Sequence, residues 1–193
     1  MKVSREQAAR NRDMVIDAAS GLFRTHGVDG VAIGDVMQAC GLTHGGFYNQ
    51  FASKDALAAE ACTRSLAKGA DRWRAIAADA AADDVAIAIA ADYVSVRNRD
   101  RPDTGCALIA LGSDAARRGG DLASAFRGGL EALTEILETT SPTLSRDAAL
   151  ARMAQMVGAM VLARGVADLA LSDEILAATR KALEADQFIS VSK

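Results

Sequence analysis

Proline is scarce in this chain, and the shortage bears directly on its fold. Pro102 and Pro142 are the only two prolines in 193 residues, whereas half of the residues are apolar and 24% are charged. Ala, Leu and Arg are frequent, and these residues favour helices where proline is absent. The composition predicts a globular all-α protein of about nine helices and gives β-strands little support.

Cysteine and histidine are too few and too scattered for a metal site or a disulfide framework. The three cysteines, Cys40, Cys62 and Cys106, form an odd number without the spacing of metal ligands. His26 and His44 are the only histidines, and no nucleophile and base stand at a spacing typical of an enzyme. We therefore expect no metal, no cofactor, no enzymatic activity, and a reducing cytoplasm as the location.

Long hydrophobic segments are also missing. The apolar run between Arg152 and Arg164 is 11 residues long, and about 20 are needed to span a bilayer. The first ten residues contain no apolar region of the signal-peptide type. We expect neither secretion nor insertion into a membrane.

Charge of one sign is almost balanced by the other, with a formal net charge of -3. A weakly acidic total argues against a protein that coats nucleic acid indiscriminately, although it permits a local basic face. Residues 1–54 hold six Lys or Arg against five Asp or Glu, and residues 55–193 hold sixteen against twenty. Four of the first six cations are Lys2, Arg5, Arg10 and Arg12, which predict either a mobile basic arm or an ordinary solvated chain start.

The first forty residues have the pattern of two helices. Apolar residues recur at helical intervals before Gly27, which ends the pattern (Val15, Ala18, Ala19, Leu22 and Phe23). A second, short helix is expected over residues 33–40. Gly41 follows it and provides the positive φ that a tight turn requires.

A third short helix is expected after this turn. Thr43 is its predicted N-cap, and Leu42 with Phe47 forms the hydrophobic staple that fixes its angle. Two short helices held at a set angle are the sequence form of a helix-turn-helix. Ser53 is then expected to cap a long fourth helix.

The stretch "GLTHGGFYNQFASKDAL" (residues 41–57) combines features that a DNA-reading helix needs. Gly45 and Gly46 allow the backbone to approach the phosphates, and helix starts near Thr43 and Lys54 provide free N–H groups for phosphate oxygens. Tyr48 and Lys54 are candidate phosphate contacts, and His44 and Asn49 are candidates for a base edge or the backbone. Each residue taken singly is more often an ordinary surface or turn residue, so the prediction rests on the combination.

The remaining chain is expected to be helical. "VAIAIAADYVSV" after residue 84 alternates like a strand, but its alanines and its neighbours favour a helix. Residues 97–105 are expected to form a polar loop, and a helix is expected from Cys106 to Arg118. Three further helices are predicted, with side-chain caps at Asp121, Ser145 and Ser172.

The first quarter of the chain resembles the N-terminal domain of the TetR family of bacterial transcriptional regulators. The resemblance lies in "AASGLFRTHGVDG", "DVMQACGLTHGGFYNQF" and "SKDAL", which begin at residues 18, 35 and 53. Residues 105–126, "GCALIALGSDAARRGGDLASAF", look like the middle of the effector domain in members that repress multidrug or reactive-compound defence genes. Ala32, Gly34 and Asn49-Gln50 depart from the family pattern.

The resemblance implies two domains, a three-helix helix-turn-helix over residues 1–54 and a larger helical effector-binding and dimerisation domain over 55–193. It implies a homodimer that presents two reading heads to a palindromic double-stranded DNA operator, and a small-molecule effector whose identity the sequence does not give. The resemblance also implies seven candidate DNA contacts: Thr43, His44, Gly45, Gly46, Tyr48, Asn49 and Lys54. Repression rather than activation follows from the resemblance alone.

Candidates for the effector site are less specific. Trp73, Phe126, Met153 and Met156 are either cavity residues or ordinary core. Cys106 is predicted at a helix start, where a thiol pKa is lowered, so it is a candidate redox or electrophile sensor; the alternative is a small buried apolar residue. The helix around residues 151–165 is apolar on more than one face, and Met160 is expected on its dimer surface, with Gly158 and Ala159 allowing close approach. An enzyme and a pure dimerisation scaffold are the rival functions, and neither explains residues 41–57.

Overall fold

The fold is all-α, as the composition predicts. The computed structural model describes residues 4–141 and 144–190, and over these residues it contains helices and no strand. The α-helices are α1 (Arg5–His26), α2 (Ile33–Ala39), α3 (Lys54–Asp79), α4 (Val85–Tyr93), α5 (Val96–Asp100), α6 (Ala107–Arg118), α7 (Gly120–Thr140), α8 (Arg146–Gly165) and α9 (Leu169–Ser190). Two single-turn 3₁₀ helices, η1 (His44–Gly46) and η2 (Pro102–Thr104), complete the order.

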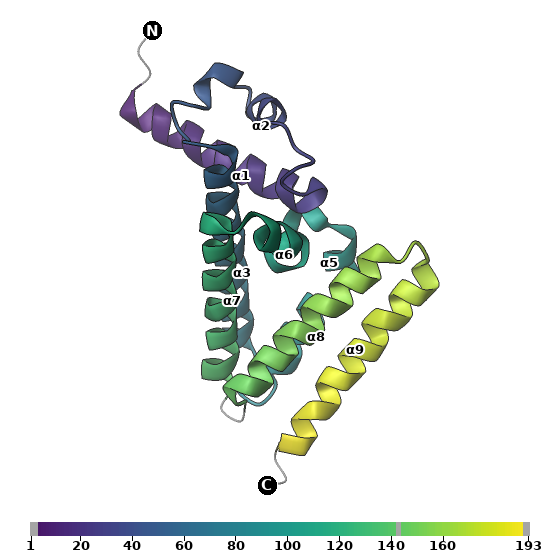
Figure 1. The fold of residues 1–193 in the computed structure, drawn as a ribbon. Helices are drawn as coiled ribbons and strands as arrows, with labels where there is room; N and C mark the ends of the chain where they lie inside the picture. Colours follow the sequence, from purple (N-terminus) through teal and green to yellow (C-terminus); the bar gives the residue numbers. More distant parts are fainter. Residues whose placement is uncertain (1–3, 142–143, 191–193) are drawn as a thin grey trace.

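The helices form a small N-terminal unit on top of a larger body (Figure 1). The N-terminal unit consists of α1, α2 and η1, and α3 begins in it and continues alongside α7. Helix α6 lies between this unit and the rest of the body, while α8 and α9 run antiparallel along one side. The domain boundary predicted after residue 54 falls at the start of α3, a helix that both parts share.

Glycines and serines end and begin several helices as predicted. Gly27 closes α1 with φ 72°, and Gly41 has φ 66° in the turn after α2. Ser53 caps α3, since its hydroxyl accepts a hydrogen bond from the Ala56 amide at 3.0 Å. Ser145 caps α8 in the same way through the Ala148 amide at 3.3 Å. These local signals therefore set the helix boundaries.

Two predicted caps are wrong. Helix α7 begins at Gly120, one residue before Asp121, because the backbone turns at Gly119 and no side chain caps it. Ser172 lies inside α9, where it is buried and donates to the Ala163 carbonyl at 2.7 Å. Asp168 accepts from the Leu171 amide at 3.0 Å in the first turn instead. Packing against α8 thus occupies the hydroxyl that looked like a cap.

The polar stretch 97–105 is more structured than the predicted loop. It contains α5 and η2, and Ser95 caps α5 through the Asn98 amide at 3.2 Å. The predicted basic arm is wrong for the residues that the structure describes. Arg5, Arg10 and Arg12 all belong to α1, whereas Lys2 lies outside the described residues.

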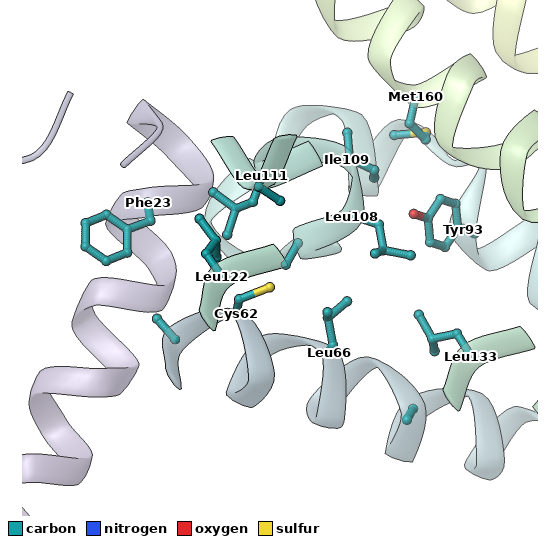
Figure 2. Packing of buried hydrophobic residues seen from close by; sticks show 14 of the residues in the cluster. Phe23, Cys62, Leu66, Tyr93, Leu108, Ile109, Leu111, Leu122, Leu133 and Met160 are labelled. Atoms are coloured by element: carbon teal, nitrogen blue, oxygen red, sulfur yellow. The ribbon is translucent and has the colours of Figure 1, made fainter. Parts of the chain in front are cut away.

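One hydrophobic core runs through both parts of the molecule. Figure 2 shows Phe23 of α1 at one end, Cys62 and Leu66 of α3 along one side, and Leu108 and Leu111 of α6 facing them. Met160 of α8 belongs to this core and is fully buried. The prediction that Met160 lies on an outer dimer surface is therefore wrong.

Candidate nucleic-acid interface and effector cavity

The segment predicted as the third helix is a single 3₁₀ turn, His44–Gly46, followed by turns as far as Gln50. Two adjacent glycines disfavour an α-helix, which explains the shorter element. Thr43 precedes the turn, but its side chain accepts no capping hydrogen bond, so the predicted cap is wrong. The Phe51 amide bonds the Phe47 carbonyl at 3.0 Å and leads the chain toward α3.

The predicted DNA contacts share one exposed surface around this turn. Thr43, His44, Gly45, Tyr48 and Asn49 are exposed, and Tyr48 leaves 63% of its surface to solvent. The other two candidates, Gly46 and Lys54, are half-buried. We call these seven residues the reading surface.

Aromatic packing holds the reading surface from beneath. Phe47 and Phe51 are buried and stack with ring centroids 5.5 Å apart. The Tyr48 ring stands edge-on to Phe47 at 5.1 Å and to His44 at 6.1 Å. Arg12 of α1 lies over Phe51 at 4.8 Å and pairs with Glu60 of α3. The turn is thus fixed to both neighbouring helices although it is only one turn long.

Helix starts border the reading surface. Lys54 is the first residue of α3, a 26-residue helix whose N-terminal N–H groups and dipole favour an anion. Helix α2 begins after Ala32, which has no side-chain oxygen; the Asp35 carboxylate bonds the Ala32 amide at 2.9 Å instead. The absence of a capping residue at Ala32, expected from its departure from the family pattern, is confirmed.

Contacts that the sequence did not predict tie the N-terminal unit to α6. Asp114 is buried, and its carboxylate accepts from the Val28 amide at 3.2 Å. Arg118 at the end of α6 bonds both Asp29 and Asp55. These partners are separated by up to 89 positions in the sequence, so no local sequence pattern predicts the contacts.

A cavity of about 310 Å³ lies in the larger body. Trp73 and Tyr93 form one wall, with ring centroids 5.8 Å apart in an edge arrangement, and Cys106 and Leu133 line it as well. Of the predicted effector residues, Trp73 and Cys106 therefore lie at the cavity. Phe126 does not line it; this side chain lies beside Gly112 of α6, where a Cβ would stand 3.6 Å from the Phe126 ring.

Cys106 is the N-cap residue of α6, as the sequence predicts. Burial nevertheless raises the pKa of its thiol, although the Tyr93 side chain, two backbone N–H groups and Arg24 act in the opposite direction. Burial also raises the pKa of Cys62 to about 12, and raises that of Cys40. The helix start thus exerts its predicted effect on Cys106, but desolvation outweighs it.

The described residues contain no cluster of three or more His, Cys, Asp or Glu side chains that would hold a metal ion. Every helix in the same part of the chain is too short or too polar to cross a membrane.

An exposed turn after a short helix, fixed on a three-helix unit and joined to a larger helical body, defines a helix-turn-helix DNA-binding protein. Residues 15–61 match the family model for bacterial regulatory proteins of the tetR family. A TetR transcriptional regulator from Chloroflexus aurantiacus is 25% identical, with a TM-score of 0.77 over 93% of this chain and 96% of that one. Residues 15–61 therefore form a tetR-type DNA-binding domain, and the whole chain shares the fold of a TetR transcriptional regulator, which indicates a DNA-binding regulator and not an enzyme.

Other solved structures share the fold at lower identity. A TetR family regulator from Cytophaga hutchinsonii is 18% identical, with a TM-score of 0.76 over 96% of this chain and 98% of that one. E. coli NemR in its reduced form is 19% identical, with a TM-score of 0.73 over 89% of this chain and 96% of that one. No curated protein matches the chain.

Proposed function

We propose that this regulator is a repressor that binds a palindromic operator as a homodimer and leaves it when a small molecule or a thiol-reactive compound acts at the cavity. The observation that carries the proposal is the reading surface, which presents an exposed Tyr48 beside two glycines and a helix start. The two rival functions, a dimerisation scaffold and an enzyme, do not explain this combination of residues at an exposed turn.

Each part of the reading surface has a role in this proposal. Thr43, Tyr48 and Lys54 bind phosphate oxygens, and His44 and Asn49 reach a base edge or the backbone. Gly45 supports the close approach of DNA. A Cβ placed there would meet no atom of the protein within 4 Å, so the protein's own packing does not require glycine at this position.

The homodimer is supported by exposed apolar residues on α8 and α9. Large apolar side chains are uncommon on the surface of a soluble monomer unless they serve an interface. Five of them lie on or at the ends of these two helices, namely Leu150, Val161, Leu162, Leu169 and Leu171. Gly158 faces open space on the same helix, since a Cβ there would meet no atom within 4 Å. A second copy of α8 and α9 fits this face and completes a four-helix bundle.

Helix α6 supports a mechanism for release. It begins at Cys106 beside the cavity and ends at Arg118, which bonds Asp29 and Asp55 of the N-terminal unit. A ligand that moves the start of α6 therefore also moves the contacts of Asp114 and Arg118. The reading surfaces of the two protomers then change their separation and no longer fit two half-sites.

A thiol-reactive effector acts through Cys106. An electrophilic alkene forms a bond between its β-carbon and the Cys106 sulfur, and the thiol proton ends on the α-carbon. Because burial raises the Cys106 pKa, this step is slow unless the ligand or a change of structure exposes the thiol. A reversible ligand is the other effector class. If an electrophile releases the wild type from the operator but not Cys106→Ser, Cys106 is the sensor. If both proteins are released equally, Cys106 is excluded as the sensor.

A mobility-shift assay with DNA flanking the protein's own gene tests the proposal. We expect a specific complex whose affinity falls in Tyr48→Phe and Lys54→Ala for operator and random DNA alike. Lys54→Ala should reduce the slope of log affinity against log salt by about one unit. His44→Ala should change the base preference. Arg146→Ala, at an exposed arginine that pairs with Glu138 on α7, is the matched control.

Failure of the wild type to bind any double-stranded DNA contradicts the proposal. A loss in Lys54→Ala that is confined to one operator sequence contradicts the phosphate role of that lysine. Transcription that rises with the amount of bound regulator, measured on a reporter, overturns repression and leaves DNA binding intact.

A further inference from the structure

Two half-buried arginines near the cavity form no ion pair with a carboxylate of the described residues. Arg24 donates to the Ser20 hydroxyl at 2.5 Å and to the backbone carbonyl of Asp103. Arg164 donates to the backbone carbonyl of Asn98 at 2.5 Å and approaches the side-chain oxygen of the same residue. Within the described residues, the Nε atom of each guanidinium is buried and has no hydrogen-bond partner.

Other arginines around the same cavity are compensated. Arg72 and Arg97 both bond the carboxylate of Asp92, at 2.6 and 2.8 Å. The Asp103 carboxylate, close to Arg24 along the turn, is held by Arg101 at 3.0 Å. A charge that is removed from water without an opposite charge is unfavourable, and burial accordingly lowers the pKa of both Arg24 and Arg164. Within the described residues, no carboxylate bonds Arg24 or Arg164 directly, and the Asp103 carboxylate acts on Arg24 only from a distance.

The two guanidiniums converge on the turn that leads into α6. A Cβ on Gly105 would lie 2.6 Å from the Arg164 Nη2 atom, so only the absence of a side chain leaves room for this arginine. Arg24 reaches the same turn through the Asp103 carbonyl and lines the cavity. The start of α6, a 12-residue helix, adds its N-terminal dipole to this positive region.

A buried hydroxyl completes the polar end of the cavity. Tyr93 is buried, and its hydroxyl forms no hydrogen bond of normal geometry within the described residues. Figure 2 shows the hydroxyl directed inward from α4 toward Leu108 of α6. Its neighbour is the Cys106 thiol, and because a thiol is a weak hydrogen-bond partner, the phenol can still donate to a stronger acceptor. The opposite side of the cavity is apolar, with Trp73 and Leu133.

The charges of the residues that line the cavity also favour an anionic ligand. Four cationic residues (Arg24, Lys68, Arg72 and Arg97) line the cavity, against the single carboxylate of Asp92. The cavity volume of about 310 Å³ corresponds to roughly ten water-sized groups. The site thus combines an excess of positive charge, a phenol beside a thiol and a flat aromatic wall in a small space.

We propose that the effector is a small aromatic carboxylate. Its carboxylate binds the Arg24 guanidinium and the Tyr93 hydroxyl, with the charge of Arg164 behind Gly105, and its ring lies against Trp73 and Leu133. The inference rests on the proposed function, because it takes this cavity to be the effector site. A carboxylate accepts from a guanidinium and a phenol at once, and the ring replaces water on the apolar wall.

Trp73 makes direct measurement of this binding straightforward. It is the single tryptophan of the chain and lines the cavity, so its fluorescence reports ligand binding in the absence of DNA. The probes are benzoate, cinnamate and 1-naphthoate, each compared with its neutral amide. We expect at least one carboxylate to bind the wild type, and to bind about tenfold or more tightly than its amide.

Matched variants locate the anion. Arg24→Gln should raise the dissociation constant of the carboxylate about tenfold or more, and Arg24→Lys should restore part of the loss. Tyr93→Phe should raise it about fivefold, and Arg164→Gln should raise it by less than Arg24→Gln does. Arg146→Gln, at an arginine that already pairs with Glu138, should leave it unchanged. Circular dichroism confirms that each variant is folded before the titration.

Three outcomes overturn the proposal: no carboxylate of the panel binds, the amides bind as tightly as the carboxylates, or inorganic phosphate binds as tightly as the aromatic acids. Unchanged carboxylate affinity in a folded Arg24→Gln variant overturns it as well. A mobility shift on the same samples separates this inference from the proposed function. If the protein binds operator but no carboxylate, the proposed ligand class is wrong and the proposed function stands. If it binds a carboxylate but no operator, the proposed function is wrong and the ligand site stands.

Discussion

The reading surface and the cavity lie at two ends of α6, and their side chains differ in how they are solvated. At the reading surface the candidate contacts come from one continuous stretch and are exposed or half-buried. At the cavity, Tyr93 is buried and Arg24 and Cys106 are half-buried; these three and Arg164, which lies behind Gly105, come from four different helices or helix caps. Exposure leaves side chains accessible to DNA, whereas burial makes the charge of each group at the cavity depend on its neighbours.

The cysteines make this difference visible within one residue type. Cys40, in the N-terminal unit, is half-buried and donates weakly to the Met14 carbonyl at 3.4 Å. Cys62 is buried between the two regions, next to Arg24 and Cys106 in its electrostatic surroundings. The same thiol group is therefore expected to react at very different rates along one chain.

The largest predicted effect concerns this order of reactivity. Since the thiolate is the reactive form, a pKa of about 12 instead of the ordinary 9.0 leaves Cys62 with about a thousandfold less thiolate at neutral pH than a free thiol. Its alkylation by iodoacetamide should be slower than that of Cys40 and should rise about tenfold per pH unit below that pKa. Mass spectrometry of the labelled peptides measures each rate, and urea-unfolded protein is the control. Equal rates at Cys40 and Cys62 in the folded protein contradict the difference between the two regions.

The next effect concerns the pairing of two reading surfaces. Leu162 is 59% exposed on α8, so Leu162→Glu leaves the monomer folded but places a charge in the proposed dimer face. We expect monomers in sedimentation and an operator affinity lower by on the order of 100-fold, because a monomer reaches one half-site.

Met160→Glu is the informative contrast to this variant. Met160 is fully buried within its own chain, two residues before Leu162 along α8. A charge there should unfold the protein rather than separate two folded protomers. A Leu162→Glu variant that remains dimeric would place the interface elsewhere.

A third effect concerns the link between the two regions. Asp114→Ala removes the acceptor of the buried Val28 amide and should lower the free energy of unfolding by about 1–3 kcal/mol. Hydrogen exchange at residues 27–31 should become faster. Arg117→Ala removes only an exposed partner of the same carboxylate and should change the free energy of unfolding by about 0.5 kcal/mol or less. Equal effects of the two variants would show that the Asp114 contact to Val28 contributes little.

The sequence predicted the N-terminal unit better than it predicted the cavity. Helix ends at Gly27, Gly41 and Ser53 depend on residues next to them, so their boundaries were predictable from local chemistry. Trp73 and Cys106 were identified as cavity candidates from residue type, but Arg24 and Arg164 were not. Arg24 and Arg164 are 140 positions apart in the sequence, and only the fold brings them to one turn and shows that neither has a carboxylate partner there.

Tertiary contacts also explain the incorrect predictions. Ser172 has the sequence context of a cap, but the approach of α8 gives its hydroxyl a partner at Ala163. Met160 has the apolar neighbours of an interface, yet the rotation of α8 turns it inward and leaves Leu162 outside. A one-residue or two-residue difference on a helix changes the face that a side chain occupies, and periodicity alone does not fix that rotation when several faces are apolar.

The smallest predicted effect returns to the N-terminal unit, at the helix start that lacks a cap. Ala32 has the extended backbone of an N-cap residue, with φ -81° and ψ 152°, and the Asp35 carboxylate already bonds its amide. In Ala32→Thr the new hydroxyl is placed to accept from the Asp35 amide, which completes a reciprocal pair of hydrogen bonds. We expect the free energy of unfolding of the full chain to rise by about 0.5–2 kcal/mol in urea denaturation. Ala32→Val adds similar bulk without an oxygen and should not share the gain; a stabilisation of equal size in both variants would mean that packing, not capping, limits this helix start.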